Sequence, residues 1–293
     1  MGTVAQTSIS HRWSRRRLLS SVGLTALQIF MTALLVTFLI PTLWMVSASL
    51  KASTELFRHP IVWIPQSPQW NNYAKAFQTL PLATFAANTF IVVMCAVFGT
   101  VTSSTLVAYS FARLRWPGRD FFFGLLMATM MLPEVITLVP RFIEFRRFGW
   151  IDTWLPLIVP YCLAGTPLYV FLIRQFLRGI PMELEEAALV DGASRLRILL
   201  QVLLPLSKPV LATVAVFALL QHYNNFMEPL IYVNSMDKWT LAVGIQAFNE
   251  SYTAQWELVM AAGTVMTLPI VAVFVVAQRY FVQGITMTGF GGR

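Results

Sequence analysis

The stretch Glu186-Ala187-Ala188-Leu189-Val190-Asp191-Gly192, followed by Val202-Leu203-Leu204-Pro205, is a charged, helix-prone segment between two long apolar runs. The chain around it has 293 residues, of which 57% are apolar and 12% charged, and its mean hydropathy is +0.65. Soluble domains carry about 25% charged residues. Because the rest of the surface suits lipid, this segment is expected to face water and to meet another molecule there.

Six apolar runs approach the roughly 20 residues that a helix needs to cross hydrocarbon. They cover residues 18–46, 85–112, 121–140, 153–177, 205–231 and 258–282. A large soluble protein with buried helices is disfavoured, because soluble helices keep a polar stripe. Pro41, Pro133, Pro160 and Pro167 lie in or near these runs, where neighbouring helices can satisfy the freed carbonyl groups. The sequence therefore predicts an all-α integral membrane protein with six transmembrane helices, some of them kinked around a cavity.

The first 17 residues are polar and basic, and they precede the first apolar run. This arrangement resembles a signal peptide, and Ser14-Arg15-Arg16 resembles a twin-arginine signal. The apolar run is too long for a cleaved signal, and no small-residue cleavage site follows it. We expect a cytoplasmic tail over residues 1–17 and a transmembrane domain over residues 18–293.

The distribution of basic residues predicts the orientation of the chain. Two thirds of the 21 Lys and Arg residues lie in segments on the same side as the N-terminus, which favours an N-in, C-in topology. This topology places Glu186 and its neighbours in the cytoplasm. One predicted outer loop, residues 142–147, is basic, and either a wrong span assignment or an outer docking surface explains it. The proline-rich and tryptophan-rich residues 47–84 are expected to form an ordered external loop.

The segment 182–204 is predicted to be a helix-turn-helix outside the membrane plane. Residues 182–190 are strong helix formers behind Pro181, with Glu183, Glu185 and Glu186 near the positive end of the helix dipole. Asp191-Gly192 interrupts this helix, and a second one covers about 194–203. An ordinary amphipathic surface helix would explain the charges alone. It would not explain the Ala-Ala pair, the Asp-Gly turn and the Leu-x-Pro at these spacings.

Other classes of function lack the residues that they need. The net charge of +8 comes from basic residues between apolar runs, so nucleic-acid binding is not expected. Cys95 and Cys162 lie in apolar runs and are expected to be small core residues. The histidines do not cluster with Cys or paired acids, so no catalytic residue and no metal site is predicted. The histidines are His11, His59 and His222.

A short polar segment lies at membrane depth within the fifth predicted span. Tyr223, Asn224, Asn225 and Glu228 are expensive in lipid and are expected to face a cavity or another helix. They are candidate substrate-pathway residues, with helix–helix hydrogen bonding as the alternative. Asn88 and Glu134 raise the same two possibilities.

Glu186-Ala187-Ala188, Gly192 and the Leu-x-Pro ending resemble the "EAA" loop of ABC importer membrane subunits, which receives the ATPase subunit. The whole chain resembles the carbohydrate-uptake branch, the group that includes the smaller membrane subunit of the maltose permease. Further matches are Ala108-Tyr109-Ser110-Phe111-Ala112-Arg113 with Pro117-Gly118, Gly149-Trp150-Ile151-Asp152-Thr153, Tyr223-Asn224-Asn225-Phe226 and Gly284-Ile285-Thr286. At 223–225, Tyr replaces the family's usual Trp and Asn its usual acidic residue, which weakens any role transferred to that position.

The resemblance implies a type I importer permease subunit in the bacterial inner membrane. It implies a second permease subunit, two ATPase subunits that bind ATP and Mg, and an extracytoplasmic solute-binding protein. The coupling residues that it implies are Glu186, Ala187, Ala188, Asp191 and Gly192. This chain has no G-x-x-x-x-G-K-[ST] phosphate loop, so it is expected to be a non-catalytic subunit with no cofactor of its own.

The resemblance also implies a carbohydrate substrate, an oligosaccharide or a polyol. Basic residues such as Arg141, Arg146 and Arg147 favour an acidic glycan, and length and family favour the second membrane subunit of an alginate importer. Glycerol phosphate and neutral maltodextrin-like substrates remain open. The rival class is an ion-gradient-driven secondary transporter, which would need more ionisable residues along a central pathway.

Overall fold

The computed structural model describes residues 6–251 and 255–289, and it describes side chains for residues 23–133, 135–247 and 255–276. Every regular element in these ranges is a helix, which confirms the all-α prediction for them. In chain order the elements are α1 (Gln6–Ser49), α2 (Ser53–Leu56), α3 (Asn71–Thr79), α4 (Leu82–Arg113), α5 (Arg119–Ala128), η1 (Thr129–Met131), α6 (Glu134–Arg147), α7 (Leu155–Leu163), α8 (Pro167–Arg178), α9 (Glu183–Val190), α10 (Arg195–Ile198), the π-helical η2 (Leu199–Leu203), α11 (Leu204–Leu206), α12 (Lys208–Tyr223), α13 (Met227–Tyr232), η3 (Met236–Lys238), α14 (Leu241–Ser251) and α15 (Trp256–Gly289).

Four stretches of the described chain are long and apolar enough to cross a membrane. They are Gly23–Ser49, Leu82–Arg113, Leu155–Arg178 and Trp256–Val276. Two bent helix pairs would add one span each: Arg119–Met131 with Val135–Arg147, and Arg195–Leu206 with Lys208–Tyr223. The described residues therefore hold four candidate spans, or six if each bent pair is one span. A multi-pass membrane protein follows from either number.

The predicted span 121–140 is not a single straight helix. Pro133 is extended, with ψ 132°, and the helices on its two sides meet at 104°. Residues 142–147, which were predicted to be a loop, are instead the last turns of helix α6. Phe145 on this helix is buried, with its ring 5.7 Å from Trp150 and 5.1 Å from Tyr232. Composition alone did not indicate that Phe145 is buried, because the residues next to it are charged.

The long helix α4 has the side-chain distribution of a membrane helix. Its buried face carries Ala96, Thr100 and Ser104, all fully buried, whereas Phe90 and Phe98 on the opposite face are 68% and 74% exposed. Small residues allow helix backbones to approach closely in lipid, where large apolar side chains can face outward at no cost. The helix therefore buries its small and polar side and presents its large apolar side to the surroundings.

The break between α7 and α8 is satisfied by two serines of α4. The Ser104 hydroxyl accepts a hydrogen bond from the Thr166 N–H at 3.1 Å, and the Ser103 hydroxyl donates to the Tyr161 carbonyl at 2.8 Å. Irregular backbone at membrane depth persists only where such partners replace the lost helical bonds. Gly165 fits at this point because an added Cβ would lie 3.1 Å from the Ser104 Cα. These contacts lock the broken span onto α4.

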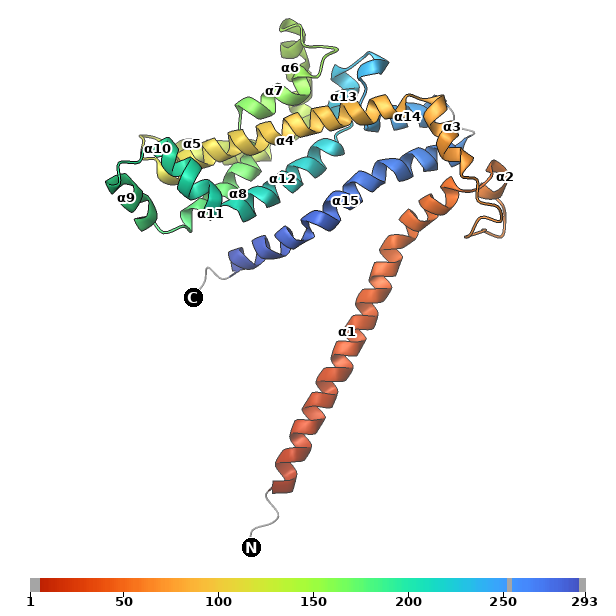
Figure 1. Ribbon diagram of the computed structural model, residues 1–293, viewed down its shortest axis with the longest axis horizontal. Helices are drawn as coiled ribbons and strands as arrows, with labels where there is room; N and C mark the ends of the chain where they lie inside the picture. The colour runs from red at the N-terminus through yellow and green to blue at the C-terminus, as the bar shows by residue number, and fades with distance from the viewer. Residues whose placement is uncertain (1–5, 252–254, 290–293) are drawn as a thin grey trace.

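Helix α4 runs the length of the body and packs against α7, α8 and α12, and α12 packs in turn against α15 (Figure 1). At one end of the body lie α9, α10 and α11; at the other lie α2, α3 and α14. Helix α1 meets α15 near the second end and diverges from the body along the rest of its length. Its side chains from residue 23 to 43 are exposed, so the surface of α1 is available to lipid or to another chain.

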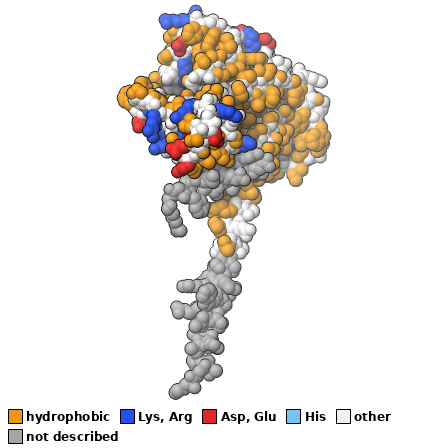
Figure 2. All heavy atoms as spheres, turned by 60° about the vertical axis from the view of Figure 1, so that its left-hand side comes forward, with side chains coloured by type: hydrophobic (Ala, Val, Ile, Leu, Met, Phe, Trp, Pro, Cys, Tyr) orange, Lys and Arg blue, Asp and Glu red, His pale blue; other side chains and the backbone are white. Residues whose placement is uncertain are grey.

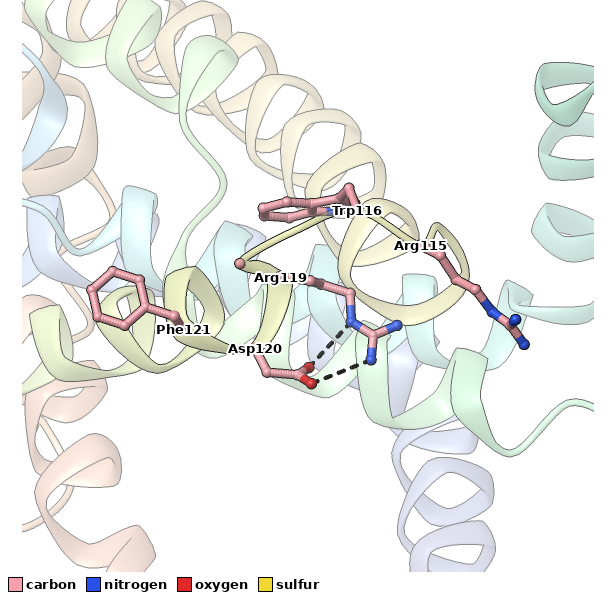
Figure 3. A pocket seen from close by; sticks show the side chains of 6 residues that line it. Arg115, Trp116, Arg119, Asp120 and Phe121 are labelled. Atoms are coloured by element: carbon pink, nitrogen blue, oxygen red, sulfur yellow. Dashed lines mark hydrogen bonds and ion pairs between the residues drawn. The ribbon is translucent and has the colours of Figure 1, made fainter.

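Helix α4 leads into α5 through a tight turn. Gly118 has φ +82°, and the Arg119 guanidinium pairs with the Asp120 carboxylate, with 3.1 Å between Nε and Oδ1 (Figure 3). Behind this turn, the guanidinium carbon of Arg174 lies 3.9 Å from the centre of the Phe123 ring. The end of α4, the start of α5 and α8 are thus held together by basic and aromatic side chains.

The predicted ordered loop 47–84 is ordered and contains α2 and α3. The Asn72 side chain donates to the Ser49 and Lys51 carbonyls, each at 2.9 Å, and the fully buried Lys51 ammonium lies 3.8 Å from the centre of the Trp44 ring. Cys95 and Cys162 are exposed free thiols, so the expectation that both are core residues was wrong. Cys162 nevertheless lies against Gly99 of α4, where an added Cβ would overlap its Sγ.

Candidate functional site

The segment 182–204 folds as two short helices joined by a capped turn. Helix α9 ends at Val190, Asp191 is its C-cap, and Gly192 follows with φ +77°. The Ala193 N–H donates to the Ala188 carbonyl at 2.9 Å, and the Gly192 N–H donates to the Leu189 carbonyl at 3.0 Å. This pair of bonds is the Schellman motif, which usually requires glycine at the left-handed position. The predicted interruption at Asp191-Gly192 is therefore a rigid C-cap.

The second helix begins with a side-chain cap. The Ser194 hydroxyl accepts a hydrogen bond from the Arg197 N–H at 3.3 Å, the usual role of serine at a helix N-terminus. The helix then continues through η2 and α11 to Leu206, beyond the predicted end near residue 203. At Ser207 it meets α12 at 80°. Because both caps are satisfied, the two helices form one stiff hairpin continuous with a candidate span.

The outer surface of this hairpin mixes acidic and apolar side chains. Glu186, Ala187, Asp191 and Gly192 are exposed, and Ala188 is half-buried. Val190 is 88% exposed on the same hairpin. Figure 2 turns this end of the body toward the viewer and shows charged side chains of both signs gathered on it, whereas apolar side chains cover the flank. The hairpin therefore presents acidic, neutral and apolar side chains to its surroundings.

The inner side of the hairpin is anchored by a buried ion pair. Arg113 Nε lies 2.8 Å from Glu185 Oε1, and the two side chains are only 5% and 1% exposed. The contact is an ion pair by distance, although its angle falls outside hydrogen-bond geometry. The same guanidinium donates to the carbonyls of Leu177 and Ile180. Arg113, the last residue of α4, therefore holds both the end of α8 and the start of α9.

Further contacts join the hairpin to the core. The Tyr109 hydroxyl donates to the Arg195 carbonyl at 3.2 Å. Ala188 and Ala193 pack against the buried cluster that includes Val170, Ile173 and Ile198. Of the predicted Ala-Ala pair, one side chain thus packs inward and the other faces outward. A displacement of the hairpin would be transmitted to α4 and α8 through these contacts.

Sequence reasoning missed Arg113 and Glu185 as partners. In the sequence, Glu185 lies near the positive end of a helix dipole and Arg113 lies at the end of an apolar run. Neither position identifies the other residue as its partner. A basic residue at the end of an apolar run, with an acidic residue in the following surface helix, was the available signal. The pairing itself is three-dimensional, because 72 positions separate the two residues in the sequence.

The predicted pathway residues lie at a helix break between α12 and α13. The Glu228 carboxylate accepts hydrogen bonds from the Asn225 amide at 2.7 Å and from the Tyr161 hydroxyl at 3.0 Å. Arg141 of α6 pairs with the other carboxylate oxygen at 3.1 Å. Arg141 is 44% exposed and Glu228 is 17% exposed. This Glu228 network joins α6, α7 and α13 around a charge pair that reaches the surface.

The remaining candidates do not join this network. The Tyr223 hydroxyl donates to the Met266 carbonyl at 2.8 Å, and the exposed Asn224 amide donates to the Leu220 carbonyl of its own helix at 2.8 Å. The Asn88 amide donates to the Asp237 and Trp239 carbonyls at 2.8 and 2.9 Å, so it connects α4 to η3. The Glu134 side chain lies outside the described residues.

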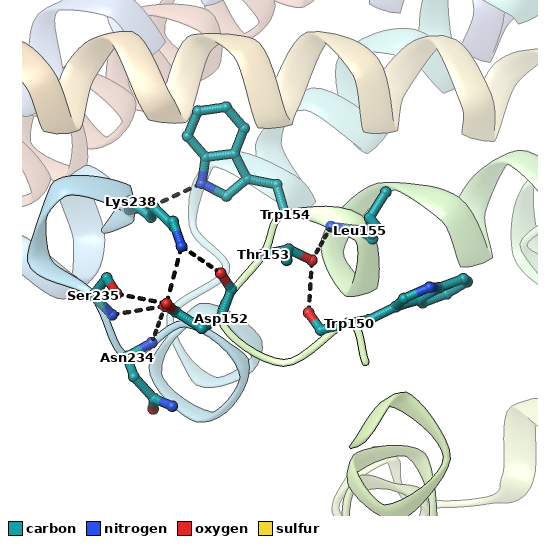
Figure 4. A network of polar contacts seen from close by, with 8 residues as sticks. All are labelled: Trp150, Asp152, Thr153, Trp154, Leu155, Asn234, Ser235 and Lys238. Carbon is teal, nitrogen blue, oxygen red and sulfur yellow. Dashed lines mark hydrogen bonds and ion pairs between the residues drawn. The ribbon is translucent and has the colours of Figure 1, made fainter. Parts of the chain in front are cut away.

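A second polar network surrounds Asp152, in the turn before α7. The Asp152 carboxylate accepts hydrogen bonds from the Asn234 and Ser235 N–H groups at 3.0 and 2.8 Å, and from Lys238 Nζ at 2.9 Å (Figure 4). The Ser235 hydroxyl, which also donates to it, is the main cause that holds the pKa of Asp152 well below its usual range, followed by the Ser235 N–H and Lys238. Asp152 thereby clamps the turn before α7 to the turn after α13.

Groups that could hold a metal ion were sought among the His, Cys, Asp and Glu side chains of the described residues, and no set of three or more was found there. The chemistry of the two polar networks is ion pairing and hydrogen bonding. The α9–α10 hairpin presents exposed acidic, neutral and apolar side chains. Together with the long apolar helices, these features define a multi-pass membrane protein with a rigid hairpin exposed at one end.

Known proteins agree with this class. A family model described as the binding-protein-dependent transport system inner membrane component matches residues 101–287. The sulfoquinovosyl glycerol transport system permease protein SmoH of Agrobacterium fabrum is 34% identical over 259 residues, which are 88% of this chain and 91% of the relative. The diacetylchitobiose uptake system permease protein NgcG of Streptomyces coelicolor is 31% identical over 257 residues, or 87% and 85% of the two chains.

A solved structure shares the fold. It is the crystal structure of a bacterial ABC transporter involved in the import of the acidic polysaccharide alginate, with a TM-score of 0.77 and 23% identity over 90% of this chain and 97% of that one. The chain therefore belongs to the family of binding-protein-dependent transport system inner membrane components. It has the type I ABC permease fold, and its relatives include permeases of sugar transporters.

Proposed function

We propose that this chain forms half of the translocation pathway of an ATP-driven carbohydrate importer in the bacterial inner membrane. The observation that carries the proposal is the exposed α9–α10 hairpin, capped at Gly192 and Ser194 and anchored by Arg113. The hairpin offers a docking surface on one side and rigid attachment on the other. A protein with no partner at this end of the body would need neither the exposed surface nor the rigid attachment.

The proposed topology has six spans with both termini in the cytoplasm, a cytoplasmic tail at 1–17 and a permease domain at 18–293. In support, α1 ends and α15 begins beside α2 and α3, at the end of the body away from α9. If each bent pair is one span, the even number returns the chain to its starting side. Helix α9 and the turn at Asp191-Gly192 then lie on the cytoplasmic side, as the excess of basic residues there favours.

In the proposed mechanism, two ATPase subunits bind ATP and Mg and close on one another. The closure displaces the surface formed by Glu186, Ala187, Asp191 and Gly192, and Arg113 carries the displacement into α4. ATP thereby biases a two-state arrangement of the spans through contacts that differ between the states. In this mechanism the chain moves with the ATPase subunits and contributes no catalytic group to ATP hydrolysis.

The proposed assembly also contains a second permease subunit and an extracytoplasmic solute-binding protein. The diverging helix α1 supports the second subunit, since its apolar side chains, such as Phe30 and Phe38, are exposed. Lipid would cover whatever part of α1 the second subunit leaves free. The family description itself names dependence on a binding protein. We assign the surface around Asp152 to the solute-binding protein.

The proposed substrate is a carbohydrate, because the named relatives carry a sulfonated glycoside in one case and an amino-sugar disaccharide in the other. The Glu228 network is the proposed pathway site. Its Arg141–Glu228 pair is charged and partly exposed, and charged groups at membrane depth usually face a water-filled cavity. Asn225 supports Glu228 there, whereas Tyr223 and Asn224 are assigned to its rim.

Affinity purification of the tagged chain from its native cell tests this proposal. The expected result is recovery of a phosphate-loop ATPase and a second membrane subunit, with ATP hydrolysis in the purified sample. A chain that purifies alone, in a detergent that keeps known ABC importers intact, would contradict the proposal. That outcome would favour the ion-gradient-driven transporter instead.

A further inference from the structure

An open surface cavity of about 420 Å³ lies at the turn between α4 and α5, at the same end of the body as α9. Figure 3 shows the side chains that line it. The lining residues are Arg115, Trp116, Gly118, Arg119, Asp120 and Phe121. This cavity is separate from both the proposed docking surface of α9 and the Glu228 network.

The surroundings of the cavity carry more positive than negative charge. Arg115 is exposed, and no hydrogen bond or ion pair is found for it among the described residues. Arg119 pairs with Asp120, and Arg174 Nη2 lies 3.9 Å from the same carboxylate. Arg178, one helical turn beyond Arg174, is exposed and also acts electrostatically on Asp120. The Asp120 carboxylate thus interacts with three guanidinium groups, and the Arg115 guanidinium adds a fourth positive charge to the lining without contacting it.

The wall next to these charges is apolar and exposed. Phe121, Phe122 and Leu125 of α5 are 71%, 50% and 54% exposed. Helix α5 belongs to a candidate membrane span, and the rest of the described chain leaves these side chains exposed, so they are available to acyl chains. A ligand that contacts both surfaces needs an anionic headgroup next to the arginines and apolar chains next to α5.

We infer that this cavity binds the headgroup phosphate of an anionic phospholipid, in the leaflet on the α9 side of the membrane. Arg115 and Arg119 bind the phosphate, and the acyl chains lie along Phe121 and Leu125. Guanidinium groups suit this role because they present several donors to phosphate oxygens. An inorganic anion would satisfy the arginines but would leave the aromatic wall unused. The inference needs only that the chain is embedded in a membrane, so it stands apart from the proposed transport activity.

Native mass spectrometry of the tagged full chain, purified with its bound subunits, tests the inference. The probes are phosphatidylglycerol and phosphatidylcholine with the same acyl chains, added in equal amount. A basic residue near an anionic lipid surface contributes about a fivefold change in affinity. We therefore expect R115Q/R119Q to weaken phosphatidylglycerol binding roughly 25-fold and to leave phosphatidylcholine binding unchanged.

The matched control is R146Q/R147Q, which removes two exposed arginines from α6 and should keep phosphatidylglycerol binding as in the native chain. If R115Q/R119Q fails to fold, R115Q alone should still give about a fivefold loss, because Arg115 makes no internal contact that folding requires. Equal losses in the test and control variants would overturn the inference. So would equal binding of the two lipids, or displacement of phosphatidylglycerol by millimolar inorganic phosphate, which would indicate a site for free anions.

Discussion

Arg113 and Glu185 form an ion pair 2.8 Å long whose side chains are almost completely buried, one at the end of α4 and the other in the first turn of α9. A buried pair need not stabilise a protein relative to apolar residues, but removal of one partner leaves a charge without compensation. The pair therefore fixes where the exposed hairpin sits against the membrane-embedded helices.

Replacement of Glu185 by Leu should destabilise the solubilised chain by about 3–5 kcal/mol, because the Arg113 charge is left buried and unpaired. The double variant R113M/E185L should recover much of this loss, although it also gives up the bonds to Leu177 and Ile180. Thermal unfolding of E185L, R113M and the double variant measures the coupling between the two residues. Additive losses would show that the two side chains do not interact.

Gly192→Val should weaken attachment of the ATPase subunit. The left-handed conformation at φ +77° costs a residue with a side chain about 1–2 kcal/mol. An added Cβ would touch nothing within 4 Å, so the effect comes from the backbone alone. Gly192→Asn is the matched control, because Asn tolerates this conformation. The measurement is the amount of ATPase subunit that co-purifies with equal amounts of each variant; equal recovery with Val and Asn would refute the role of the cap.

Asp152→Asn should remove an acid-sensitive part of the stability. The pKa of Asp152 is lowered in the folded chain, chiefly by the Ser235 hydroxyl. Its stabilising effect is therefore complete above the unfolded value of about 3.9 and is lost as the pH falls toward the lower folded value. Between pH 5 and 7 the difference in melting temperature between the native chain and D152N should be constant. Below about pH 4 it should shrink; a difference that stays constant down to pH 3 would exclude this assignment.

Asn225→Ala should cost more than Asn224→Ala. Asn225 donates to the Glu228 carboxylate, whereas Asn224 is exposed and donates to a carbonyl of its own helix. A hydrogen bond to a charged group contributes about 1.5–3 kcal/mol. Thermal unfolding should therefore separate the two variants, and uptake by cells should fall only with Asn225→Ala. Equal effects of the two substitutions would remove Asn225 from the proposed pathway.

Local signals in the sequence were enough to predict the hairpin and its turn. Asp191-Gly192 marks the end of a helix because glycine is the residue most often found at the left-handed position after one. Helix formers over 182–190 predict α9 to within a residue. The apolar runs likewise predict the positions of α4 and α15, because the length of a span is set by the membrane.

Bends and partners could not be predicted in the same way. The 104° bend at Pro133 and the 80° bend at Ser207 depend on what packs on each side, and proline alone allows either a kink or a break. The burial of Phe145 under Trp150 and Tyr232 joins residues far apart in the chain. The exposed positions of Cys95 and Cys162 depend on which helix face the bundle covers, and an apolar run carries no sign of that.

Site-specific cross-linking at Ala187 tests the proposed docking surface most directly. With Cys95 and Cys162 replaced by Ser, a single cysteine is placed at Ala187 on exposed α9, or at Arg147 on α6 as a control. A short bifunctional reagent applied to membranes of the native cell should join the chain to a phosphate-loop ATPase from position 187 and not from position 147. Absence of that product at position 187, with the complex intact, would contradict the assignment of this hairpin to ATPase docking.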